Sequence, residues 1–218
     1  MLFRSGTANA PIVIKAVPGE EVIIDGSDPS LLAGNAVWEE VDPINYPGVY
    51  STLYPIPPIR TFFEDHLLHD MVSLESLATG IRSNGNYSGL PGGYVYQDGR
   101  LYIKFPQEFN VWDGPAIDIN GHDVHAMISR EGLHVRGDYV IVDGLTLQYI
   151  SRAITLVGGP DYVVIRNNIL RYNERGILGG FKIGDPDDLR PQYALIENNH
   201  IFGPSSYLYR DWALGHNV

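Results

Sequence analysis

A phrase of ten residues recurs in the second half of the chain and constrains its fold more than any other feature. It begins at Asp138, returns at Asp161, 23 residues later, and returns a third time at Gln192. The third copy follows the second by 31 residues, and the loop of residues 184–191, rich in Pro, Gly and Asp, accounts for the surplus. Each copy is built on a β-branched run of strand length. A period in the low twenties made of such runs predicts a solenoid of stacked strands.

The position after each aliphatic run predicts where the repeats bend. One charged residue ends the run, and Gly144, Asn167 or Asn198 follows it. Glycine and asparagine adopt positive φ at the lowest cost, so each repeat is predicted to bend through a left-handed residue at this point. The next residues in the second and third copies are Asn168 and Asn199. We expect these two amides to stack inside, bonded to each other and to the bent backbone.

The repeat alignment also predicts which strands are neighbours. We expect residues 140–142, 163–165 and 194–196 to lie parallel in one sheet, because they occupy the same place in the three copies. Near the start of the chain, Val22–Gly26 has the same pattern as the first copy. This match predicts that residues 22–24 stack on residues 140–142.

Two of these phrases resemble a known family. Val-Ile-Arg-Asn-Asn-Ile at 164–169 and Leu-Ile-Glu-Asn-Asn-His-Ile at 195–201 are similar to the coils, with their asparagine ladder, of right-handed parallel β-helix proteins of the pectate-lyase-like superfamily. The opening phrases at 5–16 and 18–26 resemble the first coils of β-helical polysaccharide lyases and glycosidases. The resemblance implies an all-β fold, a right-handed parallel β-helix, and a role on extracellular glycans.

Residues 36–130 are a different kind of sequence, in which the repeat disappears and aromatic residues are frequent. Residues 94–105 alternate on both sides of Asp98-Gly99, which predicts a β-hairpin. Residues 74–78 are predicted to form one or two helical turns. We therefore divide the chain into first coils (1–35), a β-rich inserted module whose ends return close together (36–130), and further coils (131–218). The module resembles inserts of β-xylosidase-like glycosidases.

Composition limits the classes of partner. The chain has 44% hydrophobic and 19% charged residues, which predicts a packed protein, and a formal net charge of −11, which argues against nucleic acid. It contains no cysteine, so disulfides and thiolate chemistry are excluded. No apolar run approaches the ~18 residues of a membrane span. The resemblance implies a secreted, periplasmic or cell-surface protein, and we expect this chain to be a truncated piece of it, without the signal peptide.

Arg152 and Arg175 are the strongest candidates for a binding site. They stand 23 residues apart and are predicted to stack as like charges, which repel unless an anion lies between them. A guanidinium pair binds carboxylates in a bidentate manner, so a uronate or sulfated sugar fits. The alternative is a structural partner for the pair in Glu174. We expect the cleft along this face to be bordered by the loop of residues 184–191 and by the inserted module.

Other polar residues give further candidates, each with a purely structural alternative. Asp143, Arg166 and Glu197 share one repeat position and predict an ion ladder or a sugar subsite. Near the third copy and the end of the chain, the catalytic candidates are Lys182, Asp211 and His216, with Trp212 as a sugar-stacking residue, and the calcium candidates are Asp185, Asp187 and Asp188. His122, Asp123 and His125 form a candidate zinc cluster in the inserted module.

These observations lead to one functional prediction and its alternatives. We predict the N-terminal part of a carbohydrate-active β-helix enzyme, a polysaccharide lyase or glycoside hydrolase, that binds a polysaccharide or oligosaccharide and is itself inactive. A sugar epimerase on the same fold is a third possibility. A non-catalytic glycan-binding, adhesin-like or tailspike-like scaffold is the alternative from another class. An acid/base pair on one face would distinguish them, and none is evident in the sequence on the face of Arg152 and Arg175.

Overall fold

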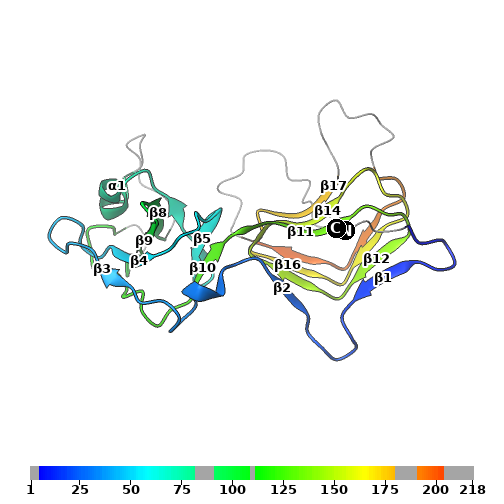
Figure 1. The fold of residues 1–218 in the computed structure, drawn as a ribbon, viewed down its shortest axis with the longest axis horizontal. Helices are drawn as coiled ribbons and strands as arrows, with labels where there is room; N and C mark the ends of the chain where they lie inside the picture. The colour runs from blue at the N-terminus through cyan, green and yellow to red at the C-terminus, as the bar shows by residue number, and fades with distance from the viewer. Residues whose placement is uncertain (1–4, 82–90, 109–110, 180–190, 204–218) are drawn as a thin grey trace. The chain divides into compact units, whose positions relative to one another are not determined.

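The computed structural model of the chain describes residues 5–81, 91–108, 111–179 and 191–203. Its contacts divide the chain into two compact units, one formed by residues 1–26 with 129–218 and the other by residues 27–128. The predicted all-β class is confirmed: strands dominate the described residues, and α1 (Leu74–Thr79) is the one α-helix among them (Figure 1). By comparison, the sequence placed the divisions at residues 35 and 130.

The first unit is built from three parallel sheets, which we call the β1, β2 and β11 sheets. The β1 sheet has the order β1 (Ile12–Lys15), β12 (Val140–Asp143), β15 (Val164–Arg166), β18 (Leu195–Glu197). The β2 sheet has the order β2 (Ile23–Asp25), β13 (Thr146–Gln148), β16 (Ile169–Arg171), β19 (His200–Phe202). The β11 sheet has the order β11 (Ser129–Val135), β14 (Ile150–Leu156), β17 (Arg175–Gly179). Strands of successive repeats lie side by side in each sheet (Figure 1).

The bends between the β1 and β2 sheets follow the local chemistry of the sequence. Gly144, Asn167 and Asn198 have φ values of 72°, 55° and 53°, as predicted for left-handed residues at this position. Inward-pointing aliphatic side chains on either side of the bend, such as Val142 and Leu147, are fully buried. Each repeat therefore turns a corner without removing its apolar side chains from the core.

Asparagine amides satisfy the backbone at these corners. Leu145 N–H donates to Asn168 Oδ1 at 3.0 Å, and Asn168 Nδ2 donates to Asn199 Oδ1 at 2.9 Å. Asn199 Nδ2 donates to Ile165 O at 2.8 Å. Asn168 is fully buried, and the predicted stack of the two amides is confirmed. Asn173 caps the next corner in the same way, which the sequence analysis did not predict.

The predicted stacking of residues 22–24 on residues 140–142 is wrong. Ile12 pairs with Val140 in the β1 sheet, whereas Ile23 pairs with Thr146 in the β2 sheet. Both early segments carry the same alternation of aliphatic residues, so the short pattern fits either sheet. The prediction that residues 36–130 form an inserted module depended on this pairing, so it is wrong in that form. The two chain connections do run together, because Ser129 N–H donates to Gly26 O at 3.1 Å.

The second unit contains two further sheets and its own aromatic core. The larger sheet has the order β3 (Glu39–Glu40), β4 (Tyr50–Leu53), β9 (Arg100–Lys104), β8 (Gly93–Gln97), β7 (His69–Asp70). The smaller has the order β10 (Val124–Met127), β5 (Arg60–Phe63), β6 (His66–Leu67). Its neighbouring strands are antiparallel except β7 and β8. A 3-10 turn, η1 (Pro29–Leu31), packs its buried Leu31 against the core.

Two local predictions in this unit are confirmed. Asp98 and Gly99 join β8 to β9 with φ values of 52° and 71°, which matches a hairpin turn with two left-handed residues. The predicted helical turns form α1, which begins with a capping box between Ser73 and Ser76 and ends at Gly80 with φ 71°. A side chain at Gly80 would collide with the buried Trp112 ring, so glycine is required there on two grounds.

Candidate functional site

One row of charged side chains crosses the β11 sheet. Glu131, Arg152 and Arg175 are aligned in register on β11, β14 and β17. The predicted adjacency of the two arginines is therefore confirmed. Glu131 was not among the predicted site residues, because it precedes Arg152 by 21 residues and so falls outside the 23-residue period. The side chains of Glu131 and Arg152 are 34% and 44% exposed, which leaves them accessible to a ligand.

Glu131 connects two cationic or ionisable groups. Its Oε1 accepts from Arg152 Nη1 at 2.6 Å, and its Oε2 lies 2.8 Å from His134 Nε2. Partial burial acts to raise the pKa of Glu131, but the hydrogen bonds with His134 and Arg152 and the charge of Arg152 outweigh it and lower the pKa. The carboxylate is therefore ionised at neutral pH and holds both neighbouring side chains in place.

Arg175 differs from Arg152 in its partners. Among the residues that the structure describes, Arg152 has an ion pair with Glu131, and no ion pair involves Arg175. Glu174, the structural partner expected from sequence, accepts a hydrogen bond from Ser151 Oγ. The row thus runs from one anion through its paired cation to a second, exposed cation, and it presents net positive charge at Arg175.

The ion ladder predicted in the β1 sheet is also present and has a fourth member. Lys15, Asp143, Arg166 and Glu197 are aligned in register on β1, β12, β15 and β18. Arg166 Nε lies 3.0 Å from Asp143 Oδ2. The hydrogen bond from Asn167 and then that from Arg166 lower the pKa of Asp143. The sequence alignment missed Lys15 because it placed Asp25 at this position.

A stack of tyrosine rings lies directly before the strands of the β1 sheet. The ring centroids of Tyr139 and Tyr162 are 4.7 Å apart, and those of Tyr162 and Tyr193 are 4.9 Å apart, with rings nearly parallel. All three residues have positive φ. The tyrosines are part of the repeated phrase, so their period of 23 and 31 residues was the available signal. Tyr162 and Tyr193 are exposed, so the stack lies at the surface.

Several candidates from the sequence lie outside the described residues. These are the catalytic candidates Lys182, Asp211 and His216, together with Trp212, and the calcium candidates Asp185, Asp187 and Asp188. The loop expected to border the cleft, residues 184–191, lies outside them except for its last residue. Their assignment stays a prediction.

The zinc candidates of the second unit have separate partners. His122 Nδ1 lies 3.0 Å from Glu64 Oε1, Asp123 Oδ1 accepts from Ala33 N–H at 2.8 Å, and His125 Nδ1 lies 3.5 Å from Ser27 Oγ. Within the described ranges, no group of three or more His, Asp or Glu side chains is arranged to hold a metal ion. The proposed cluster is therefore not formed.

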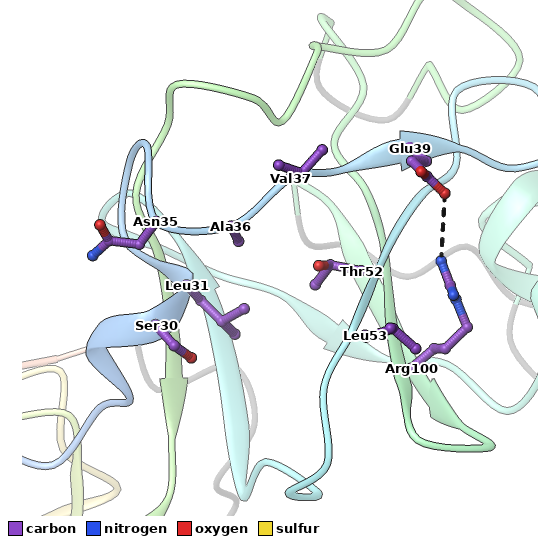
Figure 2. A pocket seen from close by; sticks show the side chains of 9 residues that line it. All are labelled: Ser30, Leu31, Asn35, Ala36, Val37, Glu39, Thr52, Leu53 and Arg100. Carbon is purple, nitrogen blue, oxygen red and sulfur yellow. Dashed lines mark ion pairs between the residues drawn. The ribbon is translucent and has the colours of Figure 1, made fainter.

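The second unit contains a cavity of about 410 Å³ that the sequence did not predict. The buried Leu31 and Thr52 and the exposed Val37 are among the residues that line it. Figure 2 shows Glu39 and Arg100 directed toward each other, with Arg100 Nη2 3.9 Å from Glu39 Oε2. Arg100 Nη2 also donates to Ser51 Oγ at 3.0 Å, so the one cation among the described residues that line this cavity is already engaged.

Comparison of the chain with protein-family models, with curated proteins and with solved structures gives no match. No helix among the described residues is long and apolar enough to cross a membrane.

Proposed function

We propose that the first unit is a right-handed parallel β-helix and that its β11 sheet binds an acidic oligosaccharide, as part of an exported carbohydrate-active protein. Support for the fold comes from the order of strands: the repeats of β12–β14 and β15–β17 each contribute one strand to each sheet, and the last described repeat adds β18 and β19 to two of them. All neighbours within the three sheets are parallel. Parallel strands joined by such crossovers are right-handed in nearly all known cases.

The row of Glu131, Arg152 and Arg175 carries the binding proposal. Arg152 and Arg175 are paired on adjacent parallel strands, whose backbones lie about 4.8 Å apart. Their two guanidinium charges therefore repel each other. Glu131 neutralises Arg152 only, and Arg175 keeps its charge exposed. A carboxylate or sulfate of a sugar placed at Arg175 relieves this imbalance with bidentate hydrogen bonds. Nucleic acid fits this site poorly, because the chain carries a formal charge of −11.

Binding is better supported than catalysis on this face. A general acid that acts at neutral pH needs a raised pKa, and the pKa of Glu131 is lowered. A retaining glycosidase needs a second carboxylate about 5–5.5 Å from the first, and the aligned residues on the next two strands are both arginines. This observation favours the second candidate function, a non-catalytic glycan-binding scaffold, for the described part of the chain.

Titration calorimetry with an oligogalacturonate tests the proposal. We expect weak binding that weakens with salt and is lost in the double variant Arg152→Ala/Arg175→Ala. The control is Lys15→Ala/Arg166→Ala, which removes the same two charges from the β1 sheet and should bind as the unchanged protein does. A neutral glucan oligomer should bind less than the uronate. Equal loss in both double variants, or no binding by the unchanged chain, would refute the proposed site. Repeating the titration with calcium and with EDTA tests the calcium prediction.

A further inference from the structure

The outer face of the β1 sheet presents two parallel rows of side chains. Alternation along the strands places Ile12, Ile14 and their counterparts in the core, so the intervening residues point outward. One outward row is aliphatic and consists of Val13, Ile141, Val164 and Leu195. The other is the charged row of Lys15, Asp143, Arg166 and Glu197.

The aliphatic row is accessible at both ends of the sheet. Val13 is 47% exposed and Leu195 is 48% exposed, and Ile141 and Val164 between them are partly exposed. A strip of aliphatic side chains beside a strip of charges gives this face both of the components of a protein contact, apolar area and polar groups next to it.

The order of charges identifies the partner that this face fits. Read across the strands, the row is positive, negative, positive, negative. A twofold axis parallel to the strands reverses the strand order of a facing copy and keeps each row opposite itself. Lys15 then lies opposite Glu197 of the second copy, and Asp143 opposite Arg166. The aliphatic row lies opposite the aliphatic row at the same time.

We propose that two copies of this chain associate through the outer faces of their β1 sheets, with the charged row as the element that sets the register. The contact is isologous and closed, so it forms a dimer and not a filament. A facing copy related by an axis across the strands would set charges against the aliphatic or tyrosine rows, so the charge pattern favours the first arrangement. This contact uses a different sheet from the proposed glycan face and does not depend on glycan binding.

The size of the face predicts a weak dimer. Its four strands are three or four residues long. With strands about 4.8 Å apart and about 3.3 Å per residue, they cover on the order of 200 Å² per copy. Stable complexes bury about 800 Å² per partner. The dimer is therefore expected to be in rapid exchange and to be populated only at high protein concentration. The exposed charge pairs of the dimer set the alignment of the two copies and add little to their affinity.

Sedimentation of the full chain over a wide concentration range, extending into the millimolar range, tests the proposal. The unchanged protein should show a reversible monomer–dimer equilibrium. Lys15→Glu places a carboxylate opposite Glu197 of the other copy, and the symmetry of the dimer repeats this repulsion once more. Glu197→Lys likewise places a cation opposite Lys15 of the other copy at two positions. Each variant alone should have a dissociation constant at least about tenfold higher. An equimolar mixture of the two variants should recover the dimer, because every opposing pair in the mixed dimer is again complementary.

The controls separate this contact from other modes of association. Arg136→Glu makes the same charge change as Lys15→Glu at an exposed position after β11 and should leave the equilibrium unchanged. Circular dichroism checks that each variant is folded. If a reversal variant is not folded, Lys15→Gln and Glu197→Gln replace it and should each weaken the dimer by a smaller factor. A monomer at every concentration, a dimer indifferent to the reversals, or a mixture that fails to recover overturns the proposal.

Discussion

Asn168 and Asn199 form a direct amide-to-amide contact inside the first unit, with Asn168 Nδ2 donating to Asn199 Oδ1 at 2.9 Å. The same Oδ1 atom accepts from the backbone N–H of Asn168 at 3.0 Å. Asn168 in turn accepts from Leu145 N–H. Each asparagine thus satisfies the corner of the preceding repeat, so that adjacent repeats share the hydrogen bonds that their bends would otherwise leave unmade.

Replacing Asn168 with Leu should strongly destabilise the first unit. The change leaves the buried Leu145 N–H, the Val142 carbonyl and Asn199 Oδ1 without this partner. Since a buried unsatisfied group costs about 1–3 kcal/mol, we expect a loss of roughly 2–4 kcal/mol in the free energy of unfolding, measured by urea denaturation. Asn167→Gly is the matched control. Asn167 has φ 55° at an exposed position, so glycine should change stability by less than about 1 kcal/mol. Similar losses in the two variants would contradict the internal role of Asn168.

Gly132→Ala should disturb the β11 sheet. A Cβ atom at Gly132 would lie 2.4 Å from the carbonyl oxygen of Ala153 on the adjacent strand, which cannot move without shifting the sheet. We expect a loss of about 1–3 kcal/mol, as for other overpacking changes. At Gly203 the nearest atom to a new Cβ is 3.4 Å away, so Gly203→Ala should be nearly neutral. Thermal unfolding of the two variants measures the difference, and a stable Gly132→Ala protein would show that the strands are farther apart.

The Glu131 carboxylate should make stability depend on pH in the acid range. Its pKa in the folded protein is lower than its ordinary value of 4.5, so the unfolded chain binds more protons as the pH falls through that value. The contribution is complete above about pH 4.5 and is lost as the pH falls through the folded pKa. Glu131→Gln should therefore be less stable than the unchanged protein at pH 7, and the gap should close toward pH 3. A difference in stability between the two proteins that stays constant with pH would contradict the ionic role of Glu131.

Lys104 provides a test inside the second unit. Its side chain is buried, with 1% of the residue exposed, and Nζ donates to the carbonyl oxygen of Ala78 at 2.7 Å near the end of α1. Burial lowers its pKa below the ordinary 10.5. Lys104→Met keeps the volume and removes the charge, so we expect stability within about 1 kcal/mol of the unchanged protein. Lys104→Ala leaves a cavity and should cost about 2–4 kcal/mol.

The pH dependence of Lys104 has the same sense as that of Glu131 but falls in the alkaline range, because the pKa of both groups is lowered in the folded protein. Between the lowered folded pKa and 10.5, the unfolded chain binds more protons at Lys104 than the folded protein does. Stability should therefore rise with pH across this window relative to Lys104→Met, which does not titrate. Denaturant titrations at pH 7 and pH 10 check the sign, and a fall in relative stability would contradict it.

Much of the first unit could be predicted from the sequence because the signals are local. The 23-residue spacing placed Ile141, Val164 and their counterparts in one parallel sheet, and the Gly144 and Asn167 positions marked the bends. The spacing also placed Arg152 beside Arg175. Alternation of aliphatic residues and the low cost of positive φ at Gly and Asn act within a few residues, so they can be read without the fold.

Other relationships were decided only by the tertiary structure. Val22 and Ile12 begin segments with the same alternation, and only packing in the core decides that Ile12 joins Val140 while Ile23 joins Thr146. Glu131 meets Arg152 across strands with a 21-residue offset that no repeated spacing announces. The partners of Glu174 and His122 depend on which side chains meet in space. Such contacts join residues far apart in the chain, and their choice depends on how the whole set of sheets closes around its core, which a local pattern does not encode.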